Sequence, residues 1–450
     1  MSNYFGTDGI RGNANEGILR SDQLVVLAHS IADWLMSQNV ARPLIYLGRD
    51  PRISGSMMEH TLAGAFAATG AHVRLMGVVP TPAVSHAVVK NRADLGVMIS
   101  ASHNPFGDNG IKLFQQDGHK LSNNEQDAIE LFLQDTARPT LWKTHDQIGT
   151  VEVVDRSLSD YLDFCKETLP AECNFNGMHI VLDTSNGSMF KCAPQLFRDL
   201  GARVTILHDQ PDGLNINKNC GSQHTQDLAS MVQEKQADLG IAFDGDGDRC
   251  IAVDENGMEL RGDQLLTICA LELKRRNELT DNALVVTVMS NLGLHLAMQD
   301  HGVKVEVSGV GDRNVMEKMQ TCSAVLGGED SGHVIYRNFH TTGDGLITAI
   351  QLIRALRASG QPLSELATCM QLYPQTMVNV SVSKKPPLET IPSIQKKIEW
   401  ANATLGKQGR VLIRYSGTES LCRVMVEGRD EDQINEIASA LATCIESHLA

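Results

Sequence analysis

An internal repeat constrains the fold of this chain more than any other feature. The stretch ADLGVMISASHNP (93–105) returns as ADLGIAFDGDGDR (237–249), with the same beginning and a different end. Each stretch is preceded by the same series of segments: a short apolar run, a polar loop, a helical segment and a second apolar run. A third copy starts at ALVVTVMSN (283–291) and closes with SAVLGGEDSGH (323–333). Because such alternation is typical of α/β units, the repeat predicts three related α/β domains with mainly parallel, mixed sheets.

The repeat also predicts where the chemistry lies. In open α/β sheets, ligands bind beyond the carboxyl ends of the strands. At that position the three copies carry different polar loops, which read Ser-His-Asn-Pro (102–105), Asp-Gly-Asp-Gly-Asp-Arg (244–249) and Gly-Glu-Asp-Ser-Gly-His (328–333). We therefore expect the three loops to converge on one central cleft, each with its own chemical role.

The C-terminal segment does not follow the repeat. GRVLIRYSGTESLCRVMVEG (409–428) predicts two strands around a Ser-Gly-Thr turn, and EDQINEIASALATCIESHL (431–449) has apolar residues at helical spacing. We expect a smaller α+β domain here, in which SVSKKPPLETIP (381–392) is a loop. A chain of 450 residues is too long for one core. The expected domains span residues 1–150, 151–256, 257–372 and 373–450.

The overall composition limits the partners and the location. The formal net charge of −15 argues against nucleic acid or an anionic membrane as a partner, because proteins that bind these present a basic face. The N-terminal MSNYFGTDGIRG lacks the apolar core of a signal peptide, and no apolar run reaches the ~18 residues of a membrane span. None of the ten cysteines belongs to a Cys-x-x-Cys motif, which favours reduced thiols. We expect a cytoplasmic protein that is a monomer or a homodimer.

The aspartate loop has the pattern of a metal site. Asp244, Asp246 and Asp248 alternate with glycines, so three carboxylates can face one hard cation while the backbone curls around it. An EF-hand would need glycine where Arg249 stands, and its flanks would be helices, whereas the flanks here resemble strands. A solvated acidic turn is a weaker alternative, since the carboxylates would repel one another without a cation. Mg²⁺ is the metal that fits best.

The serine loop allows two interpretations. Ser-His-Asn-Pro is a good turn sequence, and a purely structural turn is one interpretation. The chain has no Gly-x-Ser-x-Gly motif, so an acyl nucleophile is disfavoured. Since Ser102 ends the strand equivalent to the one before the aspartates, we favour a phosphoryl carrier, whose phosphoserine could itself ligate the metal. His103 either orients this loop or takes part in catalysis.

Two cations near these motifs carry weaker signals. Lys112 stands in DNGIK, shortly after the serine loop, and lone lysines are usually solvated. Arg11 lies in FGTDGIRG, a glycine-rich turn whose backbone can approach a ligand closely.

The third loop and the C-terminal turn suggest binding sites. Glu329, Ser331 and His333 alternate, which places them on one face of an extended loop, where carboxylate and hydroxyl suit the vicinal hydroxyls of a sugar. His333 is an acid–base group or simply a donor. The C-terminal turn is either an ordinary hairpin or a phosphate cradle, built from Arg414, Ser416, Gly417, Thr418 and Arg423.

Taken together, these motifs carry a resemblance to a known family. FGTDGIRG, ISASHNPFGDNGIKLF, FDGDGDR, GEDSGH and RYSGTE follow one another in the order found in the α-D-phosphohexomutase superfamily, and they span essentially the whole chain. The chain most closely resembles the bacterial phosphoglucosamine mutases. The resemblance implies four domains around a central cleft, three of them related and the fourth smaller.

The resemblance also assigns roles to the residues above. Ser102 matches the serine that carries the phosphoryl group, and Asp244, Asp246 and Asp248 match the ligands of one Mg²⁺, completed by the phosphoserine. Glu329 and Ser331 match the sugar-binding loop. Arg414, Ser416, Gly417 and Thr418 match the site of the phosphate that does not react. The residues matched near the transferring phosphoryl group and the sugar are Arg11, Lys112, Arg249 and His333.

The implied reaction interconverts glucosamine 6-phosphate and glucosamine 1-phosphate through a sugar bisphosphate, which also acts as activator. It would feed the synthesis of UDP-N-acetylglucosamine and of the cell wall. Alternatives are a phosphomannomutase or phosphoglucomutase with the same mechanism, a Mg²⁺-dependent phosphatase, and a non-catalytic paralogue that binds sugar phosphates.

The chain departs from the family pattern at three positions. Ser420 follows the phosphate loop where proline is usual, and Tyr415 precedes it where lysine or proline is common. Asp330 stands in the sugar loop where phosphoglucosamine mutases more often carry an amide. We hypothesise that the Asp330 carboxylate favours a sugar with a 2-ammonium group.

Overall fold

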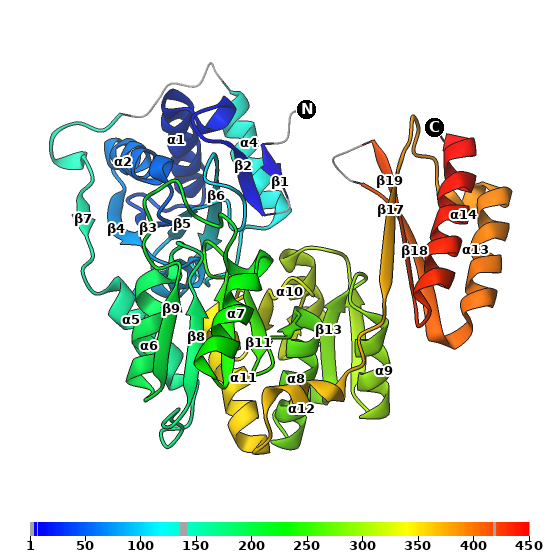
Figure 1. Ribbon diagram of the computed structural model, residues 1–450. Coiled ribbons are helices and arrows are strands. Elements are labelled where there is room, and N and C mark those ends of the chain that lie inside the picture. Colours follow the sequence, from blue (N-terminus) through cyan, green and yellow to red (C-terminus); the bar gives the residue numbers. More distant parts are fainter. Residues whose placement is uncertain (1–3, 7, 136–141, 417–419, 450) are drawn as a thin grey trace. The chain divides into compact units, whose positions relative to one another are not determined.

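The computed structural model describes residues 4–6, 8–135, 142–416 and 420–449, which form two compact units (Figure 1). The larger unit comprises Met1–Met289 and Gly302–Cys369, and the smaller unit Ser290–His301 and Met370–Ala450. None of the helices in the described ranges combines the length and the apolarity that crossing a membrane requires.

The first sheet of the larger unit has seven strands in the order β1-β2-β6-β5-β3-β4-β7. The strands from β5 to β7 in this order pair in parallel, and each of the three strands beyond β5 pairs antiparallel with its neighbour. The strands are β1 (Phe5–Gly6), β2 (Gly9–Asn13), β3 (Leu44–Arg49), β4 (His72–Val78), β5 (Leu95–Ile99), β6 (Asp108–Gln115) and β7 (Val151–Val153). The helices beside them are α1 (Ser21–Ser37), α2 (Ile53–Ala68), α3 (Thr81–Asn91) and α4 (Asn123–Gln134).

The other two sheets of the larger unit are smaller. The second contains β8 (His179–Asp183), β9 (Arg203–Leu207), β10 (Leu239–Phe243), β11 (Cys250–Asp254) and β12 (Glu259–Leu260). The third contains β13 (Ala283–Thr287), β14 (Lys304–Ser308), β15 (Leu326–Gly328) and β16 (Val334–Tyr336). The helices in this part of the unit are α5 (Ser157–Glu167), α6 (Met189–Asp199), α7 (Gln226–Lys235), α8 (Gly262–Arg275), α10 (Asp312–Thr321), α11 (Gly345–Ser359) and α12 (Leu363–Leu366).

All three sheets contain the same four-strand arrangement, which confirms the repeat. The order is β6-β5-β3-β4 in the first sheet, β11-β10-β8-β9 in the second and β16-β15-β13-β14 in the third. In each case the first pair is antiparallel and the other two are parallel. The two Ala-Asp-Leu-Gly stretches lead into the equivalent strands β5 and β10, and β15 is the third equivalent strand.

The repeated glycine of these strands has a packing role. Each glycine faces a helix so closely that a Cβ atom would overlap with a side chain of that helix. On Gly96 it would lie 2.6 Å from Val88 of α3, on Gly240 2.8 Å from Val232 of α7, and on Gly327 2.7 Å from the sulfur of Met319 of α10. The other face of the first sheet packs on α1, α2 and α4 through a shared apolar core that includes Leu95 and Val97. The glycine thus sets the distance between sheet and helix in all three copies.

Replacing Gly96 by alanine should therefore destabilise the protein. The added methyl group overpacks the contact with α3, which costs about 1–3 kcal/mol. Gly64 is the matched control, because it lies on the exposed side of α2 and a methyl group added there would meet no atom within 4 Å. There alanine should stabilise the helix by about 0.5–1 kcal/mol. Urea midpoints followed by circular dichroism measure both changes, and equal shifts would contradict the packing role.

The smaller unit matches the α+β domain expected from the C-terminal sequence. Its three-stranded antiparallel sheet has the order β17-β19-β18, formed by β17 (Gln375–Ser381), β18 (Gly409–Tyr415) and β19 (Leu421–Gly428). The helices are α9 (Leu292–Asp300), α13 (Pro392–Leu405) and α14 (Glu431–Leu449), the last within the predicted helix. The segment expected as a loop at 381–392 also contains a short 3-10 helix at Leu388–Thr390.

Candidate active site

The serine loop and the aspartate loop meet in the larger unit. Ser102 follows β5, and Asp244 follows β10, the equivalent strand of the second sheet. Ser102 Oγ donates a hydrogen bond to Asp244 Oδ2 at 2.6 Å. The backbones also touch, since a Cβ on Gly245 would lie 2.6 Å from the Ser102 carbonyl oxygen. The structure thus brings these two loops together, as the repeat predicts.

Ser102 is fully buried and held in one conformation. Its φ of 53° lies in the left-handed region, which residues with a Cβ rarely occupy. Its N–H donates to Ser100 Oγ at 2.9 Å, and its carbonyl accepts from Asn217 Nδ2 at 2.9 Å. Hydrogen bonds on both sides of the residue therefore hold the strained backbone and fix the direction of the hydroxyl.

A buried arginine that no sequence motif indicates supports this loop. Arg52 is 1% exposed, and its Nε donates to Asp50 Oδ2 at 2.8 Å. Its two terminal nitrogens donate to four carbonyls of the serine loop and its surroundings, those of Ser102, Asn104, Pro105 and Asp108. Asp50 accepts a further hydrogen bond from Ser100 Oγ at 2.7 Å. The available signal was the Arg-Asp-Pro-Arg run at the end of β3, on the same sheet edge as Ser102.

The three aspartates form a buried cluster. Each of Asp244, Asp246 and Asp248 offers a carboxylate oxygen, and the three oxygens lie within 4.8 Å of one another. The Oδ1 atoms of Asp246 and Asp248 are buried and accept no hydrogen bond from the described residues. Burial and the neighbouring carboxylates raise the pKa of Asp244 well above its usual value. Buried oxygens without donors, on carboxylates that repel one another, fit a hard cation such as Mg²⁺.

Lys112 supplies positive charge beside this cluster. It is 1% exposed, and its Nζ lies 2.8 Å from Asp246 Oδ2 and 3.2 Å from Asp248 Oδ2. Although burial opposes the charged form, these carboxylates raise the pKa of Lys112 well above its usual value. The strand β6 carries this lysine next to β5, so neighbouring strands of one sheet present Lys112 and Ser102.

A chain of alternating charges extends from Lys112, and no sequence motif indicates its middle members. Asp8 lies 3.1 Å from Lys112 Nζ and 3.1 Å from a guanidinium nitrogen of Arg11. Lys120 forms ion pairs with both Asp8 and Asp312. Although burial opposes it, the two lysines lower the pKa of Asp8 well below its usual value. Lys120 thus joins the first repeat to the third, because Asp312 begins α10.

The histidines and Arg249 lie around the same cluster. His333 Nδ1 is 3.6 Å from Asp248 Oδ1, and its Nε2 is 3.8 Å from Asp312. Although burial opposes it, these carboxylates raise the pKa of His333. His103 Nδ1 lies 3.4 Å from Ser102 Oγ, and burial, with Arg249 and Arg11, lowers its pKa to about 4. The pKa of His333 is thus shifted upward, whereas His103 is neutral at pH 7.

The Gly-Glu-Asp-Ser-Gly-His loop borders a cavity of 390 Å³ in the larger unit. Ser331 and Asp330 line this cavity together with Arg249 and Arg261. Glu329 accepts a hydrogen bond from the backbone of Gly311 at 3.0 Å. The loop therefore lies next to the arginine that ends the aspartate loop, and the structure brings the second and third loops together as well.

The predicted phosphate cradle belongs to the smaller unit. Arg414 of β18 pairs in register with Arg423 of β19, and burial, with Arg423, lowers the pKa of Arg414. Ser416 is buried, and its carbonyl accepts a hydrogen bond from Lys385 Nζ at 2.6 Å. Gly417 and Thr418 lie outside the described residues. Two arginines and a buried serine thus share one end of this hairpin.

Comparison with known proteins identifies the family. Models of the phosphoglucomutase/phosphomannomutase family match in chain order: alpha/beta/alpha domain I at residues 2–138, domain II at 159–257, domain III at 261–373 and the C-terminal domain at 377–443. A phosphoglucosamine mutase of Syntrophobacter fumaroxidans is 46% identical over 432 residues, 96% of each chain. A phosphoglucosamine mutase of Clostridium botulinum is 45% identical and covers 100% of both chains.

A solved structure agrees on the fold. A phosphoglucomutase/phosphomannomutase family protein of Burkholderia thailandensis superposes with a TM-score of 0.81, at 22% identity, over 99% of this chain and 97% of its own. The order of the four domain matches, the identity with full-length relatives and the shared fold lead to one conclusion. The chain belongs to the phosphoglucomutase/phosphomannomutase family, the α-D-phosphohexomutases.

Proposed function

We propose that the protein is a phosphoglucosamine mutase, which interconverts glucosamine 6-phosphate and glucosamine 1-phosphate through a phosphoserine at residue 102 and a sugar bisphosphate. The observation that carries this proposal is the contact of Ser102 Oγ with Asp244, 2.6 Å away, in a buried cluster of carboxylates. A hydroxyl beside a metal-binding cluster suits a phosphoryl carrier. The relatives from S. fumaroxidans and C. botulinum, matched along nearly their whole length, carry this name.

One Mg²⁺ fits this cluster. Asp244, Asp246 and Asp248 would hold it, together with a phosphate oxygen on Ser102, because Mg²⁺ prefers carboxylate and phosphate oxygens. When bound, the ion neutralises the negative charge of the transferring phosphoryl group.

The residues of the chain position the phosphoryl group and its proton. In the transfer, the bond between Ser102 Oγ and phosphorus breaks, a bond from the sugar oxygen to phosphorus forms, and the proton of the sugar hydroxyl ends on Ser102 Oγ. His103 is neutral and lies 3.4 Å from this oxygen, so it can relay the proton. Lys112, Arg11 and Arg249 neutralise the charge of the phosphoryl oxygens, and His333 acts beside them as a hydrogen-bond donor.

Two further sites would hold the rest of the substrate. The Glu329 carboxylate and the Ser331 hydroxyl would bind sugar hydroxyls beside the 390 Å³ cavity. The phosphate that does not react would bind the C-terminal turn, through Arg414, Ser416, Gly417, Thr418 and Arg423. The bisphosphate must then turn over between the two transfers, so that its second phosphoryl group returns to Ser102.

The proposal extends to the organisation and the setting of the enzyme. We place the domains at 1–150, 151–256, 257–372 and 373–450, and we propose a cytoplasmic monomer or homodimer that supplies UDP-N-acetylglucosamine for cell-wall synthesis. Neither nucleic acid nor a membrane is part of this proposal.

A panel of substrates tests the proposed function. Turnover of glucosamine 1-phosphate is measured with Mg²⁺ and a bisphosphate activator, beside glucose 1-phosphate, mannose 1-phosphate and water as acceptor. We expect a clear preference for the amino sugar. Preference for a neutral hexose phosphate would identify that sugar as the substrate and leave the proposed mechanism unchanged. Net phosphate release would indicate a phosphatase. No turnover by protein phosphorylated on Ser102 would favour a non-catalytic paralogue.

Asp330 gives a specificity prediction. Its Oδ2 lies 3.5 Å from Arg261, and the residue lines the cavity next to Ser331. If its carboxylate attracts the 2-ammonium group, Asp330→Asn should reduce the preference for glucosamine 1-phosphate over glucose 1-phosphate by about 5-fold, the size of a partly exposed charge pair. The ratio of the two kcat/KM values measures this, and an unchanged ratio would end the hypothesis.

Lys120 gives a positioning prediction. Lys120→Met leaves the carboxylates of Asp8 and Asp312 without the cation between them, which should displace Lys112 and His333. We expect kcat/KM to fall by about 10- to 100-fold, with partial recovery in Lys120→Arg. Lys90→Met is the matched control, since Lys90 is 43% exposed in its ion pair with Asp160. Equal activity of the two methionine variants would contradict the role of Lys120.

A further inference from the structure

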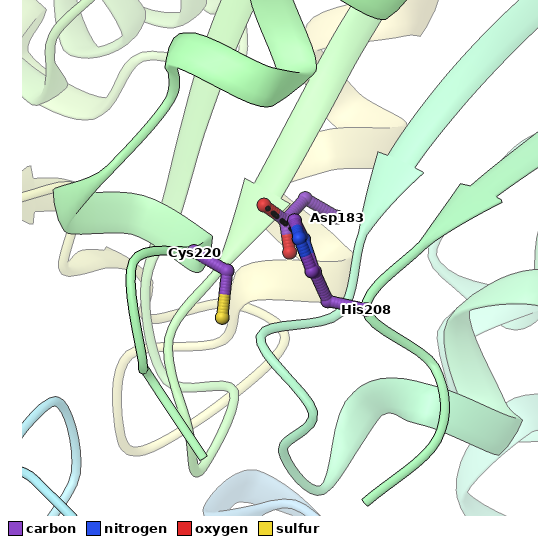
Figure 2. A group of neighbouring side chains, drawn as sticks. All are labelled: Asp183, His208 and Cys220. Atoms are coloured by element: carbon purple, nitrogen blue, oxygen red, sulfur yellow. Dashed lines mark ion pairs between the residues drawn. The ribbon is translucent and has the colours of Figure 1, made fainter. Parts of the chain in front are cut away.

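Behind the aspartate loop, the second sheet brings together three side chains that the proposed reaction does not use. Asp183 ends β8, and His208 directly follows β9, the parallel neighbour of β8. Cys220 lies on the segment before α7, next to the 3-10 helix Gly221–Gln223. Figure 2 shows the Asp183 carboxyl group beside the His208 ring, with Cys220 on a separate segment. Each residue offers one ligand atom, and the three atoms lie within 4.8 Å of one another.

We infer that Asp183, His208 and Cys220 form a second metal site, for Zn²⁺ or a similar thiophilic divalent cation. Oxygen, imidazole nitrogen and thiolate sulfur together are a typical zinc ligand set, and three protein ligands leave a fourth position for water. This set differs from the all-carboxylate cluster beside Ser102, which suits Mg²⁺. The proposed site should therefore bind thiophilic cations such as Zn²⁺, and the carboxylate cluster should bind Mg²⁺.

The pair of Asp183 and His208 has the geometry of two ligands that share an ion. His208 Nδ1 lies 3.1 Å from Asp183 Oδ2. Nevertheless Nδ1 is buried and has no hydrogen-bond partner among the described residues, so its ring is not aimed along a hydrogen bond to that oxygen. The two atoms are thus in contact without a well-formed hydrogen bond between them, as two ligands of one metal ion would be.

Outer contacts orient the ligands. Asp183 accepts backbone hydrogen bonds from Ser185 and Gly221, each at 2.8 Å, which fix its carboxylate. The other ring nitrogen of His208, Nε2, lies 3.5 Å from Asp227 Oδ2 on α7. A histidine between a ligand position and a carboxylate is the usual arrangement in zinc sites, because the carboxylate fixes the tautomer and the ring orientation. Cys220 is 1% exposed, so its thiol is protected from the solvent.

The site would act on the active site through one short segment. Asn217, three residues before Cys220, donates from Nδ2 to the carbonyls of Ser102 and Asn104, at 2.9 and 3.0 Å. A Cβ on Gly221 would lie 2.6 Å from the carbonyl oxygen of Phe243, directly before the aspartate loop. Binding of the cation replaces the thiol proton of Cys220 and ties this segment to β8 and β9. The ion would therefore stabilise the segment that supports the serine loop, without contacting the substrate.

Cobalt binding tests the inference on the intact protein. The protein is freed of metal, supplied with excess Mg²⁺ to fill the carboxylate cluster, and titrated with Co²⁺. We expect one equivalent to bind with a thiolate-to-cobalt charge-transfer band and tetrahedral d–d bands, and Zn²⁺ to displace it. Zn²⁺ should also raise the Tm of the native protein.

Variants identify the ligands. Cys220→Ser should lose the charge-transfer band and the Zn²⁺-dependent rise in Tm, and His208→Gln should bind Co²⁺ at least about 100-fold more weakly. Asp227→Asn should weaken binding by about 10-fold, as expected for an outer partner. Cys444→Ser is the matched control, on α14 of the smaller unit, and should behave as the native protein. No band in the native protein, or an unchanged band in a folded Cys220→Ser variant, would overturn the inference; His208, whose side chain is 25% exposed, gives a second test if Cys220→Ser does not fold.

Discussion

Ser102→Ala is expected to reduce turnover by at least about 1,000-fold, the effect of losing one positioned group in a phosphoryl-transfer site. The substitution removes only the hydroxyl group, which carries the phosphoryl group in the proposed reaction. Its place is defined by the 2.6 Å hydrogen bond to Asp244 and by the fully buried backbone at φ 53°. The nearby Ser100 hydroxyl does not replace it, because Ser100 Oγ donates to Asp50.

Two measurements separate the loss of the carrier from damage to the loop. Native protein incubated with labelled bisphosphate should gain one phosphoryl group by mass spectrometry, and Ser102→Ala should gain none. Ser100→Ala is the matched control in the same buried loop, since it removes the hydrogen bond to the Ser102 N–H and leaves the Ser102 hydroxyl in place. We expect it to be phosphorylated and to lose only about 10-fold in kcat. The carrier role would be wrong if Ser102→Ala kept a tenth of the native kcat/KM.

The repeat was visible in the sequence because its signals are local. Short apolar runs, the order of strand and helix, and the shared glycine are all properties of neighbouring residues, and they predict the equivalent strands β5, β10 and β15. The position of Ser102 and Asp244 follows from this, since equivalent strands end at the same edge of related sheets. The rejection of an EF-hand holds for the same reason: the aspartate loop lies between the strands β10 and β11.

The partners of the site residues could not be predicted, because the partners are distant in the sequence. Arg52 and Ser102 are linked across 50 residues, and Lys120 and Asp312 across 192. No periodicity in the sequence links such pairs, and a single arginine or lysine in a sequence is usually interpreted as a solvated side chain. Burial is what distinguishes them, and burial of a charged side chain depends on the finished fold. The cluster of Asp183, His208 and Cys220 could not be predicted for the same reason, although Asp183 ends β8 and His208 directly follows β9.

Removing the Arg52 guanidinium is the second large effect that we expect, this time on stability. Arg52→Met keeps an unbranched apolar stem but leaves Asp50 as a buried carboxylate without its cation. Breaking a buried ion pair in this way costs about 3–5 kcal/mol. The carbonyls of Ser102 and Asn104 also lose donors at 3.0 and 2.8 Å, so the serine loop should loosen together with the first sheet.

Thermal unfolding and kinetics measure this effect on the intact protein. At about 2–4 °C for each kcal/mol, the Tm of the first transition should fall by about 10 °C in Arg52→Met. Asp50→Asn added to this variant should recover part of the loss, because it removes the unpaired charge, and the double-mutant cycle isolates the pair. Arg20→Met is the control, since the ion pair of Arg20 with Asp22 is exposed and should contribute less than about 1 kcal/mol. A native Tm in Arg52→Met would show that the guanidinium does not support the serine loop, and the loop would then owe its strained conformation to Ser100 and Asn217 alone.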